Sequence, residues 1–175
     1  MKSKLPLCVA ILINFTFNAD AQLKSKERIK TKWAKEVTPE SVWKLYPRPQ
    51  LVRKEWMSLN GLWNYSIKEK NEKQPQKFDG KILVPFGVES QLSGVEKKVT
   101  PEQKLWYDHS FTIPSNWKGK QILLHFEAVD WETSVWLNGK LIGTHKGGSN
   151  PFSFDITSFL SKEKQQITVS VWDPS

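Results

Sequence analysis

The stretch VDWETSVWLNGKLIGTHKGGSNPFSFD, Val129 to Asp155, decides the fold because it encodes a hairpin, a reversal and a returning strand. Residues 134–137 alternate between two faces, and Asn138-Gly139 supplies the positive backbone angles of a two-residue turn before the chain returns. Gly147-Gly148 permits backbone geometry that other residues avoid, and the period of two resumes at Phe152. The stretch therefore predicts two paired strands followed by a third.

The same alternation recurs through most of the remaining chain. Five further segments predict strands: Leu62–Ile67, Ile82–Val84, Leu105–Ile113, Ile122–Ala128 and Ile167–Val171. Residues 68–80 are polar and predict a loop. We expect the apolar faces of the two longest segments to be buried, with Trp63 in the core. Short strands separated by Gly and Pro turns are typical of an all-β sandwich.

Six short motifs follow one another along this predicted domain. They are YPRPQ at 46–50, Trp56 with LNGLW at 59–63, VPF at 84–86, WY at 106–107 before FTIP at 111–114, VDW at 129–131 and HKGG at 145–148. Their order resembles the N-terminal sugar-binding domain of glycoside hydrolase family 2, which includes β-galactosidases, β-glucuronidases and β-mannosidases. The resemblance covers residues 46–173. It implies a jelly roll, in which two antiparallel sheets enclose a core about 10 Å thick.

Residues 1–21 have the pattern of an export signal. Lys2 and Lys4 precede an apolar run, residues 5–17, and Ala19-Asp20-Ala21 resembles a cleavage site before Gln22. The alternative is a membrane anchor, but the run is shorter than the roughly 20 residues that span a bilayer. We therefore expect a cleaved signal and a periplasmic or extracellular protein, not a membrane protein.

The rest of the chain divides into a lead-in and one domain. Residues 22–45 are basic, and Thr38-Pro39 predicts the start of a short helix. Residues 46–175 form the predicted β-sandwich, which is long enough to bury one core. The only cysteine, Cys8, lies in the signal, so we expect no disulfide in the mature protein.

The formal net charge of +8 raises the question of a polyanionic partner. The lysines are spread along the chain among glutamates, and no nucleic-acid-binding motif accompanies them, so we expect no nucleic-acid partner. The three histidines, His109, His125 and His145, do not have the spacing of metal ligands. We expect no metal and no other cofactor.

The family resemblance implies hydrolysis of β-glycosides with retention, which needs two carboxyl groups roughly 5 Å apart. In the family both lie on a later (β/α)8 barrel that follows an immunoglobulin-like domain, and a barrel usually needs about 250 residues. Neither catalytic carboxylate is recognisable here. We expect a fragment that is not catalytic by itself and whose partners are those further domains. The alternatives are a stand-alone carbohydrate-binding module and a protein-interaction β-sandwich.

Four residues are candidates for contact with a carbohydrate. Trp131 and Trp106 could stack on the apolar face of a sugar ring, although core packing is the alternative for both. Asn150 and Asp173 follow predicted strands and could bind hydroxyl groups, with turn formation as their alternative role. The pattern leaves open which side Trp136 faces.

The other motif residues have structural explanations. Asp130 is expected to accept backbone hydrogen bonds where one strand gives way to the next. Asn138 and Gly139 form the hairpin turn, and Gly147 and Gly148 form the later reversal. His145 precedes those glycines, where a ring nitrogen can bind a backbone carbonyl.

Overall fold

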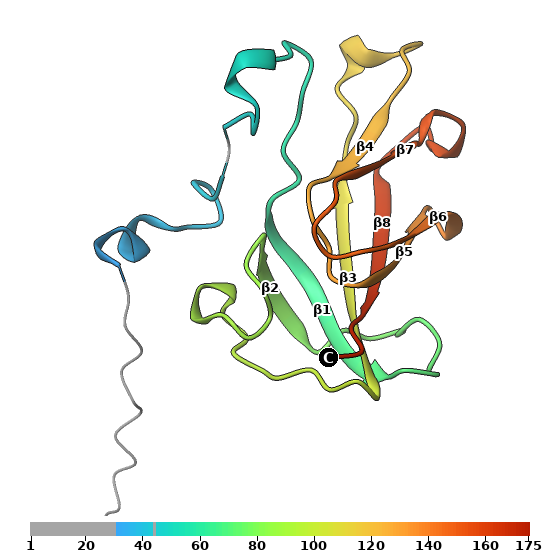
Figure 1. Cartoon of the computed structure of the whole chain (residues 1–175). Coiled ribbons are helices and arrows are strands. Elements are labelled where there is room, and N and C mark those ends of the chain that lie inside the picture. Colours follow the sequence, from blue (N-terminus) through green and yellow to red (C-terminus); the bar gives the residue numbers. More distant parts are fainter. Residues whose placement is uncertain (1–30, 44) are drawn as a thin grey trace, which may run out of the picture.

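The computed structural model describes residues 31–43 and 45–175, which form two antiparallel β-sheets with short 3₁₀ helices between the strands (Figure 1). The α-helix does not occur among these residues. The predicted export signal and the first part of the lead-in lie outside the described residues. The all-β prediction is confirmed.

The structure has eight strands and five 3₁₀ helices within the described ranges. The strands are β1 (Gly61–Glu69), β2 (Gly80–Val84), β3 (Gln103–Phe111), β4 (Leu123–Phe126), β5 (Glu132–Leu137), β6 (Lys140–Lys146), β7 (Phe152–Asp155) and β8 (Gln165–Trp172). The 3₁₀ helices are η1 (Lys32–Glu36), η2 (Pro49–Leu51), η3 (Gln91–Ser93), η4 (Ser115–Trp117) and η5 (Thr157–Phe159).

The two sheets differ in size. The larger sheet has the strand order β2-β1-β3-β8-β5-β6, and the smaller one pairs β4 with β7. The last strand, β8, therefore lies inside the larger sheet, between β3 and β5 (Figure 1). This pairing brings the end of the described chain next to the start of β5.

The core consists of alternate residues from the facing sides of both sheets. Ile82, Val135, Leu137 and Ile167 are completely buried in the larger sheet, and Leu124 lies opposite them from β4. Burying each such side chain stabilises the fold by about 1.5–3 kcal/mol. We call this side of the larger sheet its inner face and the opposite side its outer face.

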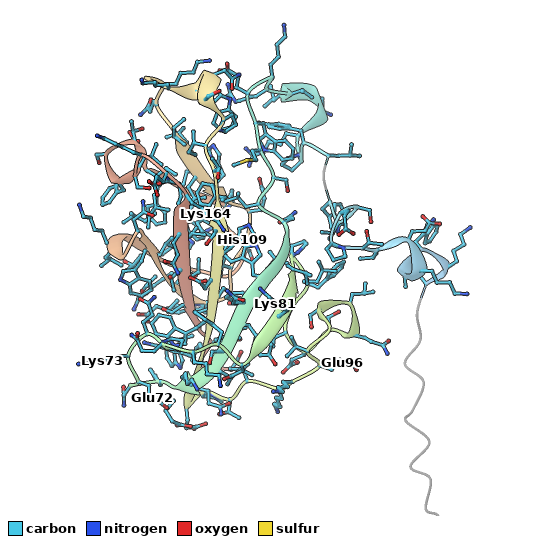
Figure 2. The ribbon with its side chains drawn as sticks, turned by 180° about the vertical axis from the view of Figure 1, so that it is seen from behind. Glu72, Lys73, Lys81, Glu96, His109 and Lys164 are labelled. Carbon is cyan, nitrogen blue, oxygen red and sulfur yellow. The ribbon has the colours of Figure 1, made fainter. Side chains whose placement is uncertain are left out.

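The inner face also carries aromatic and ionisable residues. Trp63 is 6% exposed, which confirms the prediction that it belongs to the core. Its ring stacks on that of His109, with 4.9 Å between the centroids. Burial lowers the pKa of His109, and the charges of Lys164 and Lys81, on either side of it in Figure 2, act in the same direction.

The hairpin between β5 and β6 has the predicted turn. Asn138 and Gly139 have φ angles of +51° and +77°. The Asn138 side chain donates to the Phe159 carbonyl and to Gln165 Oε1, each over 2.9 Å, and its Oδ1 accepts from the Gln166 N–H. Asn138 therefore fixes the turn and also joins it to the start of β8.

Two local expectations differ from the structure. The strand β4 already ends at Phe126, and Ala128, which was predicted to be buried, is exposed. The segment from Thr38 makes one turn, in which the Val42 N–H donates to the Thr38 carbonyl over 3.0 Å. The regular 3₁₀ helix of the lead-in is η1, which precedes Thr38.

Residues 70–79, which we call the strap, connect β1 to β2 and contact the outer face. At one end the Lys70 N–H donates to the Glu102 carbonyl over 2.6 Å, and at the other the Asp79 N–H donates to the Tyr65 carbonyl over 2.8 Å. In the middle, Gln74 Nε2 donates to Thr168 Oγ1 over 3.2 Å. Figure 2 shows Glu72 and Lys73 of the strap at the lower edge of the molecule.

Asp79 fastens the end of the strap to β1. Its carboxylate accepts from the Ile67 N–H over 3.0 Å and lies 3.6 Å from Lys68 Nζ. Burial acts to raise the pKa of Asp79, but the hydrogen bond from the Ile67 N–H and the charge of Lys68 outweigh it, so the pKa is lowered. The ionised form therefore stabilises the strap.

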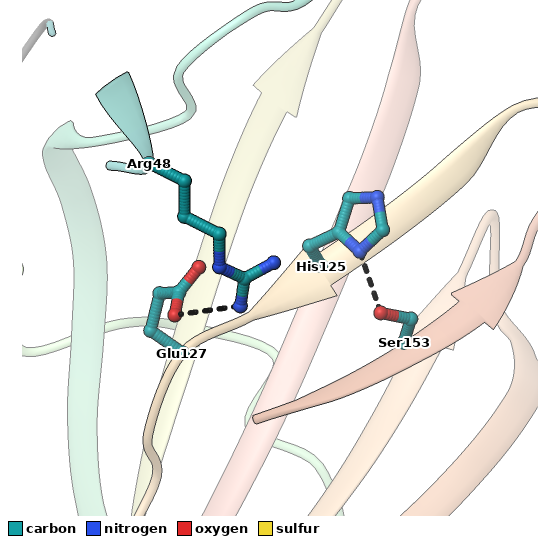
Figure 3. A network of polar contacts seen from close by, with 4 residues as sticks. All are labelled: Arg48, His125, Glu127 and Ser153. Carbon is teal, nitrogen blue, oxygen red and sulfur yellow. Dashed lines mark hydrogen bonds and ion pairs between the residues drawn. The ribbon is translucent and has the colours of Figure 1, made fainter. Parts of the chain in front are cut away.

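The solvent-facing side of the smaller sheet carries polar residues beside the exposed Leu123. His125 Nδ1 and Ser153 Oγ lie 2.5 Å apart across β4 and β7, as Figure 3 shows. In the same view Arg48 Nη2 lies 3.4 Å from Glu127 Oε2. This exposed ion pair joins the segment before β1 to the end of β4, and exposed pairs of this kind contribute at most about 1 kcal/mol.

Candidate carbohydrate-contact site

The start of β5, the end of β6 and the end of β8 meet at one place in the larger sheet. Glu132 is paired with Lys146 on one side and with Trp172 on the other. Trp131 donates its N–H to the Trp172 carbonyl over 3.4 Å, and its own carbonyl accepts from the Gly147 N–H over 3.0 Å. We call Asp130, Trp131, Glu132, Lys146 and Trp172 the strand-end surface.

Trp131 offers the most accessible indole of this surface. This residue is 37% exposed. Lys146 Nζ lies 5.5 Å from the centre of the indole ring and 3.2 Å from Glu132 Oε2. A cation at this distance is attracted to the ring face, and the carboxylate holds the cation in place.

Trp172 is fixed more firmly. Its Nε1 donates to the Pro101 carbonyl over 2.7 Å, and Lys70 Nζ lies 3.1 Å from the ring centre. One face of this indole is therefore covered by a lysine of the strap. The strand-end surface thus combines two indoles with Lys146, and Lys70 of the strap lies against it.

Asp130 lies at the start of the strand-end surface. The residue is exposed. The carboxylate lies against the backbone of Gly148, where an added Cβ would overlap it. The structure shows this approach to Gly148, and the role of Asp130 as an acceptor of backbone hydrogen bonds stays a prediction.

His145 also lacks part of its expected contact. Its ring stacks on Phe152, with 4.1 Å between the centroids, and its Nε2 is buried without a partner in the described chain. The directly paired residue, Thr133, has a buried hydroxyl without a partner as well. Stacking fixes His145 here, and Nε2 does not bind a backbone carbonyl. Gly147 has the positive φ, +120°, that the reversal requires.

The two polar candidates have different surroundings. Asn150 is exposed on the loop between β6 and β7. Asp173 follows β8 and accepts from the Ser175 N–H over 2.9 Å and from the Ser175 hydroxyl over 2.7 Å. These two hydrogen bonds lower the pKa of Asp173. Asp173 forms a turn, as its alternative role predicted, whereas Asn150 remains open to solvent.

Trp106 lies in the middle of the larger sheet, away from solvent. It is 4% exposed, and its ring centre lies 5.5 Å from that of Trp136 on β5. Its Nε1 is buried without an acceptor within the described ranges. Trp106 therefore supports Trp136 and does not offer its own ring to a sugar from solvent.

Sequence reasoning did not single out Trp172, Lys146 or Lys70. Only the pairing of β5 with β8 and the path of the strap place them beside Trp131, and neither can be read from periodicity. In the part of the chain that the structure describes, acidic, histidine and cysteine side chains form no group that could hold a metal ion. Nor does that part contain a helix long and apolar enough to cross a membrane.

Comparison with known proteins shows the family to which the chain belongs. The model of the glycosyl hydrolases family 2 sugar-binding domain matches residues 56–175. The β-glucuronidase of Paenibacillus borealis is 28% identical over 134 residues, which cover 73% of this chain and 22% of that protein. The β-galactosidase of Thermoanaerobacter pseudethanolicus is 44% identical over 55 residues, which cover 31% of this chain and 7% of that protein.

A solved structure agrees with these sequence relatives. The β-glucuronidase of Faecalibacterium prausnitzii superposes with a TM-score of 0.58 and 28% identity, covering 73% of this chain and 22% of that one. The chain therefore spans about a fifth of the length of both β-glucuronidases. The family match starts after the YPRPQ motif but includes the other five motifs. The chain belongs to glycosyl hydrolases family 2, as a member of its sugar-binding domain family.

Proposed function

We propose that this chain is the sugar-binding part of a longer enzyme that hydrolyses β-glycosides, and that it does not break the glycosidic bond itself. The family match and the share of each relative that the chain covers support this proposal. The names of the relatives, β-glucuronidase and β-galactosidase, suggest the substrate class. Immunoglobulin-like and barrel domains of the same enzyme are the proposed partners.

The sugar contact that we propose is the strand-end surface. The observation that carries it is an exposed indole, Trp131, beside an exposed carboxylate, Asp130. The indole can stack on the apolar face of a pyranose, and the carboxylate can accept hydrogen bonds from two neighbouring hydroxyl groups. Asn150, exposed on the adjoining loop, is a further candidate, whereas the Asp173 carboxylate is already occupied by Ser175.

Contacts with other domains are proposed for the exposed apolar residues. Leu45, Leu51, Val52, Leu62 and Leu123 are all at least 45% exposed. Apolar side chains at the surface often mark interfaces. In this proposal they meet the rest of the enzyme, and a protein-interaction role of the isolated domain is the alternative.

The test compares the isolated chain with the Trp131→Ala variant. Tryptophan fluorescence is followed during titration with methyl β-galactoside, methyl β-glucuronide and methyl β-mannoside. If the strand-end surface needs the other domains, no saturable change occurs in the isolated chain, and Trp131→Ala raises KM in the full-length enzyme. A saturable change that Trp131→Ala removes indicates a stand-alone binding module. An unchanged KM refutes the proposed contact.

Catalysis and export have separate tests. Release of nitrophenol from nitrophenyl β-glycosides by the rigorously purified chain would contradict the non-catalytic role. We also propose that residues 1–21 direct export to the periplasm or the exterior and are removed. N-terminal sequencing of the secreted protein should then begin at Gln22, and retention of Met1 in a cytoplasmic product would contradict this.

A further inference from the structure

One row of side chains crosses the outer face of the larger sheet. Strand pairing aligns Lys81 with Asn64, Asn64 with Asp108, Asp108 with Thr168, and Thr168 with Trp136. Lys81 Nζ donates to Asn64 Oδ1 over 2.6 Å, and Asn64 Nδ2 donates to Asp108 Oδ1 over 3.1 Å. Thr168 Oγ1 lies 3.4 Å from Asp108 Oδ2. The row is polar and internally bonded until it ends at an indole.

The indole at the end of the row is supported from one side. Val135 and Leu137 are completely buried on the inner face, so Trp136 between them points to the outer face. Its ring rests beside the buried ring of Trp106, with planes inclined by 30°. Trp136 itself is only partly buried, and its partner on β6, Leu141, is 53% exposed. This places an immobilised aromatic ring at an accessible surface.

Two glutamine amides flank the row, and both are oriented by buried groups. Gln166 Nε2 donates to Asp108 Oδ2 over 2.9 Å, and Gln74 Nε2 donates to Thr168 Oγ1 over 3.2 Å. Asp108 and Thr168 are 5% and 3% exposed, whereas both glutamines are exposed. Because each NH₂ group bonds inward, each amide oxygen remains as an acceptor for a group arriving from solvent.

The chemistry of these groups selects one class of ligand. Fixed amide oxygens require a ligand with several hydroxyl donors, and an aromatic face favours a ring with an apolar side. Beneath the patch, the ring of Trp106 is buried and supports the face of Trp136 that does not meet solvent. The buried Asp108 disfavours a second carboxylate nearby. These features fit a neutral sugar and not a uronate.

We propose that Trp136, Gln74 and Gln166 form a second saccharide-contact surface, which binds neutral pyranosides. It is distinct from the strand-end surface, because Trp136 lies four residues along β5 from Glu132, which corresponds to about 13 Å. The two surfaces also differ in charge. Lys146 and Lys70 accompany the indoles of the strand-end surface, whereas amides and a buried carboxylate accompany Trp136.

The test follows the indole N–H signals of the whole chain, labelled with ¹⁵N-tryptophan, by NMR. Methyl β-galactoside and methyl β-glucoside are titrated in turn, and methyl β-glucuronide is the charged comparison. The Trp136 signal, assigned with Trp136→Phe, should shift saturably with a neutral sugar and at least about fivefold more weakly with the glucuronide. Equal responses to the neutral and charged sugars overturn the proposal, as does the absence of any shift at Trp136.

Variants separate binding from folding. Trp136→Ala should abolish the response, and Gln74→Ala should weaken it about fivefold, the usual effect of losing one hydrogen bond. Gln121→Ala is the matched control, because Gln121 is also exposed and donates to a carboxylate, Asp155 Oδ2, over 2.8 Å, but at the smaller sheet. If Trp136→Ala fails to fold, the pair Gln74→Ala and Gln121→Ala decides.

The outcomes also separate the two surfaces. Shifts confined to the signals of Trp131 and Trp172 support the strand-end surface and overturn the second one. Shifts confined to the signals of Trp136 and Trp106 support the second surface, even if the strand-end surface binds no sugar. Equal weakening by Gln74→Ala and Gln121→Ala contradicts a specific contact at Gln74.

Discussion

Both faces of the six-stranded sheet contain buried residues, but these are buried by different means. The inner face is closed by apolar side chains such as Val135, Leu137 and Ile167, which pack against the smaller sheet. The central part of the outer face is polar, with Asp108, Thr168 and Ser170 each at most 5% exposed. These polar groups are buried where the strap crosses the sheet and where neighbouring side chains supply their hydrogen bonds.

The difference shows how one sheet combines two kinds of stability. Apolar burial depends on the area removed from water and tolerates exchanges between apolar side chains of similar volume. A buried polar row depends on every donor and acceptor having a partner, and loss of one member leaves the others uncompensated. The inner face therefore holds the sheets together, while the outer face fixes the orientation of particular side chains.

The largest effect is expected on the inner face. Leu137→Ala removes a completely buried side chain and should lower the free energy of unfolding by about 2–5 kcal/mol, because a cavity remains. Urea denaturation measures it. Leu141→Ala, in the same hairpin but 53% exposed, is the control and should change stability little. Similar losses for both would show that the hairpin does not distinguish its faces.

A smaller loss is expected on the outer face. Asp108→Ala leaves Asn64, Gln166 and Thr168 without their shared acceptor and should cost about 1–3 kcal/mol. The exposed Asp155 also accepts hydrogen bonds, from Gln121 and Thr157, so Asp155→Ala is the matched control. Denaturation of the two variants side by side sharpens the comparison. A larger loss of stability in Asp155→Ala than in Asp108→Ala would contradict the prediction.

Alkaline pH tests a neutral group of the inner face. Burial raises the pKa of Tyr107 to about 12, from 10.0, so the folded state retains the proton longer than the unfolded state. The resulting stability is complete below pH 10 and is lost as the pH rises through 12, by about 1 kcal/mol at pH 11. Tyr107→Phe should remove this loss between pH 9 and 11. An identical pH dependence in the two proteins would contradict it.

The smallest effect is expected at mildly acidic pH. Burial lowers the pKa of His109, and Lys164 and Lys81 lower it further, although the Leu62 carbonyl and Asp108 oppose them. The folded state therefore favours the neutral ring, so stability is complete above the ordinary pKa of 6.5 and is lost as the pH falls below it. His109→Gln should remove this loss between pH 7.5 and 5. Thermal unfolding at both pH values measures it.

The inner face could be predicted from the sequence because its signals are local. Alternation places Val135 and Leu137 on one side, and Asn138-Gly139 specifies the turn that aligns the next strand. The inward position of Trp63 follows from the same period. Helix formation from Thr38 stops after one turn, since the proline-rich segment at 46–49 interrupts it.

The outer face and the strand-end surface could not be predicted in this way. Both depend on pairings between distant segments, such as Trp136 with Thr168 and Glu132 with Trp172, which local periodicity does not specify. The burial of Asp108 requires knowledge of where the strap lies. The position of the Asp130 carboxylate likewise depends on its approach to Gly148, which is 18 residues away in the sequence.

Surface connections between strands usually accept insertions, cleavage sites and affinity tags. The strap is an exception, because Lys70 and Gln74 hold it to β8 and Asp79 holds it to β1. A peptide inserted there would admit water to the carboxylate beneath and release the glutamine that the strap supplies. Insertions and tags in this domain should therefore avoid residues 70–79. The exposed turn at Gly119 is a better position for them.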